Sequence, residues 1–180
     1  MSWDERYSRG EHMGMAPMGF LVELAERLPA GKMLDLACGS GRHASLFADK
    51  GWKVTAVDSS GVALGILRER DPRVTCVQAD LETPGAFDLG VDCWDLVVVT
   101  MYLQPSLFPL IRQAVRPGGR VAMAIPLEDP REGVRPMNPA FLLRGVADLM
   151  VEFPGCTVEL ARETNPGPPG RRVAEFVAVR

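Results

Sequence analysis

The stretch MLDLACGSGRHA at residues 33–44 decides the fold, because a short apolar run leads directly into a glycine-rich turn. An apolar run of this length is typical of a buried parallel strand. Gly39 and Gly41 allow the backbone to turn sharply and to approach a ligand with no Cβ in the way. The N–H groups that open the following helix would face that ligand. We therefore predict a strand, a ligand-binding turn and a helix in succession.

Asp35 indicates what kind of ligand this turn binds. Gly39, Gly41 and Ala44 also fit the dinucleotide pattern G-x-G-x-x-G/A, but three small residues at this spacing recur by chance. A carboxylate four residues before the first glycine would be badly placed against a pyrophosphate. The same carboxylate is well placed for a ligand that carries an ammonium or sulfonium charge.

Helical and strand-like segments alternate on both sides of this stretch. Strands are expected at about residues 33–37, 53–57, 74–78, 94–100 and 120–126. Helices are expected at about residues 18–28, 42–50, 60–70, 107–115 and 138–150, and residues 127–137 have the composition of a loop. Strands that alternate with helices in this way predict an open, doubly wound parallel sheet.

The end of the chain has the pattern of a β-hairpin. Residues 156–161 and 172–180 are strand-like, and the linker 165–170 between them is rich in proline and glycine. The hairpin would add two strands at one edge of the sheet, the last of them antiparallel. We therefore expect about seven strands, mostly parallel, in one domain.

Composition excludes several classes of protein. Hydrophobic residues make up 47% and charged residues 24% of the 180 residues, as in soluble globular proteins. The net charge of −3 argues against a nucleic-acid partner, because phosphate binding needs a basic surface. No apolar run approaches the roughly 18 residues of a membrane span, and the charged N-terminus lacks a signal-peptide core, so a cytoplasmic location is expected. The four cysteines are widely spaced, which fits neither a zinc site nor a disulfide framework.

The stretch LDLACGSGRHA resembles the first motif of the class I S-adenosylmethionine-dependent methyltransferases, usually written D/E-x-G-x-G-x-G, with Ala37 in place of the first glycine. Asp58 follows 17 residues after Gly41, where the family has an acid that binds both ribose hydroxyls. Asp80 matches the acid near the adenine amino group. The segments WDLVVVT (94–100) and VRPGGRVAMAIP (115–126) match the fourth strand and the proline-glycine-glycine turn of the family.

This resemblance implies a Rossmann-like sheet with strand order 3-2-1-4-5-7-6, in which strand seven is antiparallel. Residues 18–180 would form a single methyltransferase domain, and residues 1–17 a lead-in or a lid. The N-terminal WDERY (3–7) and the GRHA at 41–44 are similar to small bacterial methyltransferases of the tellurite-resistance type, where asparagine is common in place of His43.

The implied function is transfer of a methyl group from S-adenosylmethionine to a small-molecule acceptor, with S-adenosylhomocysteine as the product. No catalytic or metal-binding residue is assigned. The absence of an N-P-P-Y-type motif at 100–105 disfavours a nucleobase or glutamine-amide acceptor. The residues implied to bind the cofactor are Asp35, Ala37, Cys38, Gly39, Gly41, His43, Asp58, Ser59, Asp80, Leu81 and Thr100.

Other interpretations of the same residues remain open at this point. Asp58 could be only a helix cap, Asp80 an ordinary loop acid and Tyr102 a core residue, while His43 is expected to meet backbone groups rather than to act in catalysis. The alternative functions are a non-catalytic protein that binds S-adenosylmethionine or S-adenosylhomocysteine, an NAD-dependent oxidoreductase and an accessory module of a larger enzyme. The methyl acceptor and the oligomeric state are not predicted.

Overall fold

A computed structural model describes residues 2–131, 134, 137–165 and 170–180 of the chain. It divides into two compact units, Met1–Asp88 and Leu89–Arg180, which are called the N-terminal and the C-terminal unit below. Across the described residues, no helix combines the length and the apolar character needed to cross a lipid bilayer.

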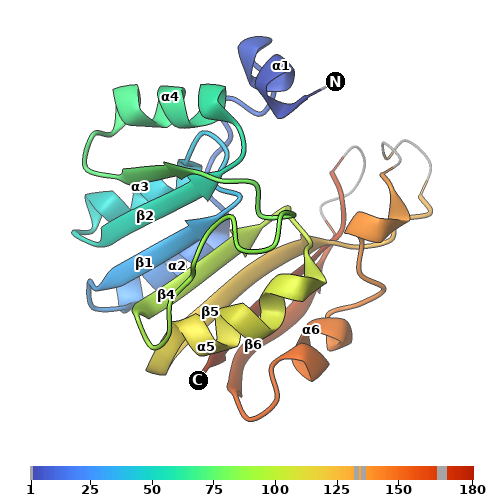
Figure 1. The fold of residues 1–180 in the computed structure, drawn as a ribbon. Coiled ribbons are helices and arrows are strands. Elements are labelled where there is room, and N and C mark those ends of the chain that lie inside the picture. Colours follow the sequence, from blue (N-terminus) through green and yellow to red (C-terminus); the bar gives the residue numbers. More distant parts are fainter. Residues whose placement is uncertain (1, 132–133, 135–136, 166–169) are drawn as a thin grey trace. The chain divides into compact units, whose positions relative to one another are not determined.

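The described residues of the N-terminal unit form three parallel strands and four helices (Figure 1). β1 pairs with β2, and β2 pairs with β3, so Asp35 lies opposite Ala56 and Asp58 lies opposite Gln78. The carboxyl ends of the three strands therefore lie at one edge, where ligands bind in open α/β sheets. The elements are α1 (Trp3–Ser8), α2 (Gly19–Arg27), β1 (Lys32–Leu36), α3 (Arg42–Asp49), β2 (Lys53–Asp58), α4 (Gly61–Arg70) and β3 (Thr75–Gln78).

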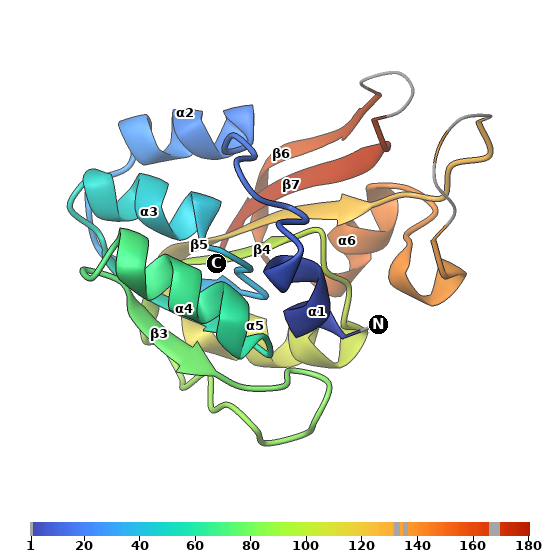
Figure 2. The same cartoon turned by 90° about the horizontal axis from the view of Figure 1, so that it is seen from above.

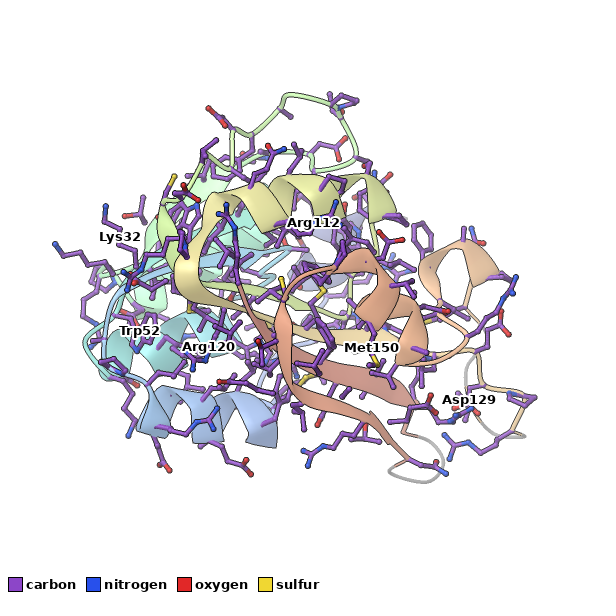
Figure 3. The ribbon with its side chains drawn as sticks, turned by 90° about the horizontal axis from the view of Figure 1, so that it is seen from below. Lys32, Trp52, Arg112, Arg120, Asp129 and Met150 are labelled. Carbon is purple, nitrogen blue, oxygen red and sulfur yellow. The ribbon has the colours of Figure 1, made fainter. Side chains whose placement is uncertain are left out.

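The core of this unit follows from the apolar pattern of the strands and helices. Every β1 residue after Lys32 is buried, as expected for a parallel strand covered on both faces. Phe47 of α3 packs edge-on against Trp52, with 5.3 Å between the ring centroids. Figure 3 shows Lys32 and Trp52 near the start of β1 and β2, at the edge of the sheet opposite to the carboxyl ends. The candidate site therefore lies at the carboxyl ends of the strands, next to the glycine-rich turn.

The C-terminal unit holds a mixed sheet. β4 and β5 are parallel, whereas β7 runs antiparallel to both β5 and β6. Arg120 of β5, labelled in Figure 3, binds Glu159 of β6 through two hydrogen bonds of 2.7 and 2.9 Å. The elements are β4 (Trp94–Thr100), η1 (Pro105–Leu107), α5 (Phe108–Ala114), β5 (Val115–Pro126), η2 (Pro139–Phe141), α6 (Ala147–Glu152), β6 (Thr157–Thr164) and β7 (Val173–Val179).

The strands follow the order β3-β2-β1-β4-β5-β7-β6, with antiparallel β5–β7 and β7–β6 pairs. This confirms the predicted seven-stranded Rossmann-like sheet and its antiparallel C-terminal strand. The single domain expected at residues 18–180 stays a prediction. Most of the 165–170 linker lies outside the described residues.

The helix expected from residue 138 to 150 is wrong. The side chain of Asn138 caps a short 3₁₀ turn, η2, and the chain then becomes extended at Leu142. Leu143 forms a parallel bridge with Leu127, just beyond β5. Its N–H donates to the carbonyl of Pro126 at 3.0 Å and its carbonyl accepts from the N–H of Glu128 at 2.9 Å, so the helix α6 begins only at Ala147. The apolar spacing of this segment fits a helix, but hydrogen bonding to the end of β5 overrides it.

One further boundary and one further helix differ from the sequence-based expectation. β5 begins at Val115, so the glycine-containing turn expected to precede the strand is part of it. Gly118 has a φ of +78° within that segment, and its N–H donates to the carbonyl of Arg180. The helix α1 was not expected at all, since the N-terminal segment was interpreted as a lead-in or a lid.

Candidate functional site

The turn between β1 and α3 is built from left-handed backbone. Ala37, Gly39 and Gly41 have φ angles of +53°, +56° and +76°. The N–H of Cys38 donates to the carbonyl of Val57 at 3.1 Å, which fastens the turn to the end of β2. Glycine adopts such angles without strain, whereas Ala37 is strained where the family motif has a glycine. The turn is therefore held in a fixed shape at the carboxyl edge of the sheet.

The two glycines of this turn make room for different neighbours. A Cβ on Gly41 would lie 2.5 Å from both Cδ atoms of Leu67, a fully buried side chain of α4. Gly41 is thus required by packing within the fold. A contact of Gly41 with a ligand stays a prediction. A Cβ on Gly39 would meet the hydroxyl of Tyr7, which reaches the turn from α1.

Asp35 is an uncompensated buried acid beside this turn. The side chain is 1% exposed, and neither carboxyl oxygen has a hydrogen-bond partner among the described residues. Burial, and then the charge of Asp58, raise the pKa of Asp35 to about 7, while the charge of Arg42 acts in the opposite direction. Buried polar groups are normally paired, so this carboxyl is a position for a cationic ligand group.

Asp58 lies at the end of β2 and accepts hydrogen bonds from the glycine turn and from the N-cap of α4. Its Oδ2 accepts a hydrogen bond from the N–H of Gly39 at 2.8 Å, and its Oδ1 accepts one from the N–H of Ser60 at 2.8 Å. Burial raises its pKa, and these backbone donors oppose the rise. The N-cap of α4 is Ser60, whose Oγ accepts from the N–H of Ala63, so Asp58 is not the cap residue. Each carboxyl oxygen keeps a lone pair for a further donor.

The acid predicted to meet an adenine is part of a local turn. Asp80 is exposed, and its oxygens accept from the N–H of Glu82 at 3.0 Å and from the hydroxyl of Thr83 at 3.1 Å. Leu81 beside it is buried, whereas Ser59 is exposed and its carbonyl accepts from the amide of Gln78. Their contact with a ligand stays a prediction.

His43 is a buried and Cys38 a half-buried residue, and neither has the pKa of a reactive group, which is near-neutral for a histidine and lowered for a cysteine. The Nε2 of His43 accepts from the N–H of Met18 at 3.2 Å, which ties the start of α2 to α3. Burial, with a smaller contribution from Arg42, lowers the pKa of His43 to about 3. Burial also raises the pKa of the Cys38 thiol. The backbone-facing role expected for His43 is what the structure shows.

The helix α1 lies within the segment that was expected to be a lead-in or a lid, and its contacts with α4 were not predicted. Asp4 accepts from the hydroxyl of Ser60 at 2.6 Å and from the N–H of Val62 at 3.2 Å, so α1 is fastened to the start of α4. Figure 2 shows α1 beside that end of α4. The signal was the WDERY segment at residues 3–7, which was noted for its resemblance and not as part of a site.

Thr100 and its neighbours end β4 in the C-terminal unit. Thr100 is buried, and Met101 follows with a φ of +57° while its N–H donates to the carbonyl of Ala124 at 2.7 Å. Left-handed backbone at a non-glycine residue is uncommon and gathers at functional sites. The hydroxyl of Tyr102 is buried. A contact of Thr100 with the cofactor stays a prediction.

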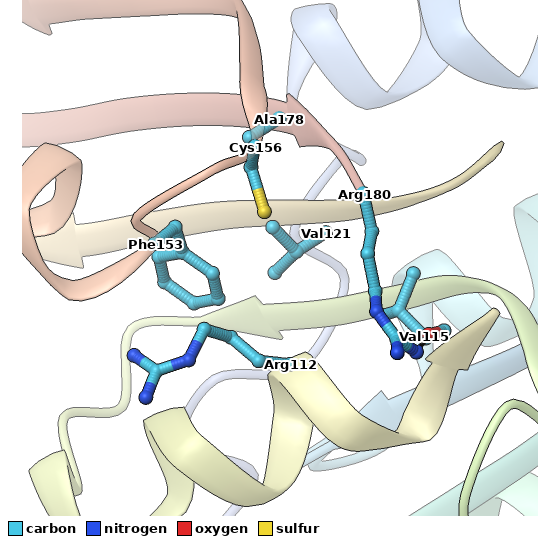
Figure 4. Close-up of a pocket in the computed structure, with 7 residues that line it drawn as sticks. All are labelled: Arg112, Val115, Val121, Phe153, Cys156, Ala178 and Arg180. Atoms are coloured by element: carbon cyan, nitrogen blue, oxygen red, sulfur yellow. Dashed lines mark hydrogen bonds between the residues drawn. The ribbon is translucent and has the colours of Figure 1, made fainter. Parts of the chain in front are cut away.

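A small cavity in the C-terminal unit is not this site. Figure 4 shows that Arg112, Phe153, Cys156 and Arg180 surround it with their side chains. Arg112 donates to the carbonyl of Glu152, and Arg180 donates to the carbonyl of Val115. None of the lining residues is a predicted site residue, and both arginines serve the fold.

In a comparison with known proteins, the stretch that contains the glycine turn matches a known family. Residues 33–119 match the model of a family described as "Methyltransferase domain". A trans-aconitate 2-methyltransferase of Paracidovorax citrulli is 35% identical over 118 residues, which are 58% of this chain and 43% of that protein. A ubiquinone biosynthesis O-methyltransferase of Vibrio parahaemolyticus is 30% identical over 113 residues, 58% of this chain and 47% of that protein. The chain thus spans about half the length of these curated relatives.

Solved structures confirm the fold. TehB from Haemophilus influenzae matches with a TM-score of 0.77 at 19% identity, over 98% of this chain and 67% of that one. A S-adenosylmethionine-dependent methyltransferase from Mesorhizobium loti matches with a TM-score of 0.70 at 20% identity, over 93% of this chain and 99% of that one. The Rossmann-like fold that the resemblance implied is therefore confirmed.

Proposed function

We propose that the chain transfers a methyl group from S-adenosylmethionine to a small-molecule acceptor, because residues 33–119 match a family described as a methyltransferase domain. The observation that carries the proposal is Asp35, a buried carboxyl without a hydrogen-bond partner beside a glycine turn. S-adenosylmethionine presents an ammonium group, which would pair with the unpartnered carboxyl of Asp35. Its ribose hydroxyls would donate to the lone pairs that Asp58 keeps beside its two backbone donors. The donor set of the chain therefore fits the cofactor.

The cofactor, when bound, supplies a sulfonium methyl group that is already activated for transfer. Asp35 would bind the ammonium group of its amino-acid end. Asp58, held by the N–H groups of Gly39 and Ser60, would accept from the ribose hydroxyls in a fixed orientation. Asp80 and Leu81 are proposed to meet the adenine. The chain's contribution is to bind and orient, which is how proximity lowers the barrier of a transfer reaction.

The acceptor is proposed to be a small molecule. The chain is acidic overall, which disfavours a nucleic-acid acceptor. The name of one relative gives trans-aconitate as its acceptor, whereas another relative is named a ubiquinone biosynthesis O-methyltransferase. The names of the relatives therefore do not agree on one acceptor. A soft nucleophile such as a thiolate needs no general base for this transfer, whereas an oxygen or nitrogen nucleophile can need one. We propose no catalytic base among the described residues.

An NAD-dependent oxidoreductase is the competing assignment for a glycine turn of this kind. It would place a pyrophosphate near the uncompensated carboxyl of Asp35, where two negative groups repel. The structure thus favours the sulfonium cofactor over the dinucleotide.

Thermal and chemical unfolding with each cofactor tests the proposal. S-adenosylhomocysteine or S-adenosylmethionine at 100 times its Kd should raise the free energy of unfolding by about 2.7 kcal/mol. NAD at the same concentration should leave it unchanged. Stabilisation by NAD, with none by either sulfur cofactor, would overturn the assignment. Formation of S-adenosylhomocysteine in the presence of a panel of small acceptors then separates an enzyme from a protein that only binds.

A further inference from the structure

The middle of the glycine turn carries a buried hydrogen-bond acceptor. Ser40 is 8% exposed and lies between Gly39 and Gly41, whose φ angles of +56° and +76° are left-handed. The carbonyl of Ser40 accepts a hydrogen bond of 2.6 Å from Nη2 of Arg70, the last residue of α4. Hydrogen bonds with a charged donor are stronger than those between neutral groups. A side chain that is 30 residues away in the chain therefore holds the centre of the turn.

The same guanidinium also connects the turn to the helix that follows it. Nη2 of Arg70 donates to Oγ of Ser45 in α3 at 3.1 Å. The N–H of Ser45 donates to the carbonyl of Gly41 at 3.0 Å, and the N–H of Gly41 donates to the carbonyl of Cys38 at 3.0 Å. The charge of Arg70 lies at the carboxyl end of α4, where the helix dipole favours a cation. Arg70 thus ties α4 to both the turn and the start of α3.

The residues of the turn do not fix its conformation by themselves. Glycine populates positive and negative φ about equally readily, so Gly39 and Gly41 give the backbone little preference of its own. Hydrogen bonds from other elements have to select one conformation. The N–H of Gly39 donates to Oδ2 of Asp58 at 2.8 Å on the side of β2, and Arg70 donates to Ser40 on the side of α4.

We propose that Arg70 is a positioning residue of the cofactor site. By holding the carbonyl of Ser40, Arg70 keeps the N–H of Gly39 directed at Asp58, and so keeps the Asp58 carboxyl oriented for the ribose. A turn that is ordered before binding removes the ordering cost that binding would otherwise include. Arg70 acts through the backbone, and no contact with the cofactor is assigned to it. The inference rests on the proposed function, because it concerns the site of the same cofactor.

Arg73 offers a matched comparison, since it is another exposed arginine close to the end of α4. Its Nε and Nη2 atoms donate to Asp71 at 2.7 and 2.8 Å, and Nη2 also donates to Asp49 at 2.6 Å. Asp71 follows α4 and Asp49 ends α3, so these partners lie outside the turn. A variant of Arg73 therefore disturbs the packing around α4 without removing the hydrogen bond to Ser40.

Replacement of each arginine by methionine separates positioning from stability. Arg70→Met keeps most of the aliphatic length, and the exposed location of Arg70 lets the variant fold. We expect it to weaken S-adenosylhomocysteine about fivefold in Kd, because the turn then has to be ordered on binding. Arg70→Lys, which retains a charged donor, should recover the Kd to within about twofold. Arg73→Met should lower the free energy of unfolding in urea and change the Kd less than about twofold. Calorimetric titration of the full chain gives the Kd values.

Amide hydrogen exchange reports on the turn without any ligand. Arg70→Met should speed exchange at the N–H groups of Gly39 and Gly41, whose acceptors are the Asp58 carboxyl and the Cys38 carbonyl. The amides inside β1 should keep their rates, because they belong to the buried core. Arg73→Met should leave the two glycine amides unchanged.

The outcomes distinguish the inference from the proposed function. If Arg70→Met leaves the Kd unchanged, or if Arg73→Met weakens the ligand equally, the inference is wrong while the proposed function stands. Unchanged exchange at Gly39 and Gly41 in Arg70→Met would likewise overturn it. If the unmodified chain binds neither S-adenosylmethionine nor S-adenosylhomocysteine, the proposed function itself fails, and the exchange rates still decide whether Arg70 orders the turn.

Discussion

Replacing Asp35 with asparagine should stabilise the fold and at the same time weaken cofactor binding. The carboxyl is 1% exposed without a hydrogen-bond partner among the described residues, and burial raises its pKa from 3.8 to about 7. An acid with a folded-state pKa above its unfolded value binds more protons when folded, so the free energy of unfolding decreases as pH rises from about 4 to 7. Asparagine has no charge to bury and avoids this loss.

The size of the effect follows from the two pKa values. A difference of about three pH units corresponds to about 4 kcal/mol at 1.36 kcal/mol per unit. Asp35→Asn should therefore gain about 4 kcal/mol over the unmodified chain at pH 8, and about 1 kcal/mol or less at pH 4, where the folded carboxyl is already protonated. Burial dominates the shift, so most of the gain should survive high salt.

Urea unfolding of both proteins at pH 4, 6 and 8 measures the gain, provided that the slopes agree. Glu69→Gln, an exposed acid on α4, is the matched control and should show no such pH-dependent gain. Equal unfolding free energies for Asp35→Asn and the unmodified chain at all three pH values would refute the argument. Titration with S-adenosylhomocysteine should show the opposite change, because the variant loses the anionic partner of the ammonium group.

Three other substitutions test the turn and the end of β2. Gly41→Val should lower the free energy of unfolding by about 3 kcal/mol in urea titrations, because its side chain overlaps the buried Leu67 at a positive φ; an unchanged midpoint would contradict this. Ala37→Gly should raise it by about 0.5–1 kcal/mol by relieving left-handed strain, with cofactor affinity unchanged in calorimetry. Asp58→Ala should weaken S-adenosylhomocysteine roughly 10²-fold, about 2.7 kcal/mol, and also lower the melting temperature, since two backbone N–H groups lose their acceptor; a Kd within twofold would remove Asp58 from the ribose site.

The order of apolar runs and turn residues along the chain was enough to predict a mostly parallel sheet. β-strands of alternating α/β proteins are buried on both faces, so residues 33–37 and 94–100 are recognisable as apolar runs followed by turn residues. The proline- and glycine-rich linker likewise indicated the antiparallel hairpin that forms β6 and β7. Local composition was misleading at 138–150, where pairing with the end of β5 interrupts the helical periodicity.

For the site, the sequence alone determined which acids follow which strands, and hence that Asp35 and Asp58 lie at one edge of the sheet. It also determined the glycine turn, because motif residues adjacent in sequence remain adjacent in space. Only the tertiary structure decided that Gly41 makes room for Leu67, that Asp35 has no hydrogen-bond partner among the described residues, and that Tyr7 covers the turn. Those facts depend on contacts between segments distant in the chain, and no spacing or composition encodes which side chain arrives at such a contact.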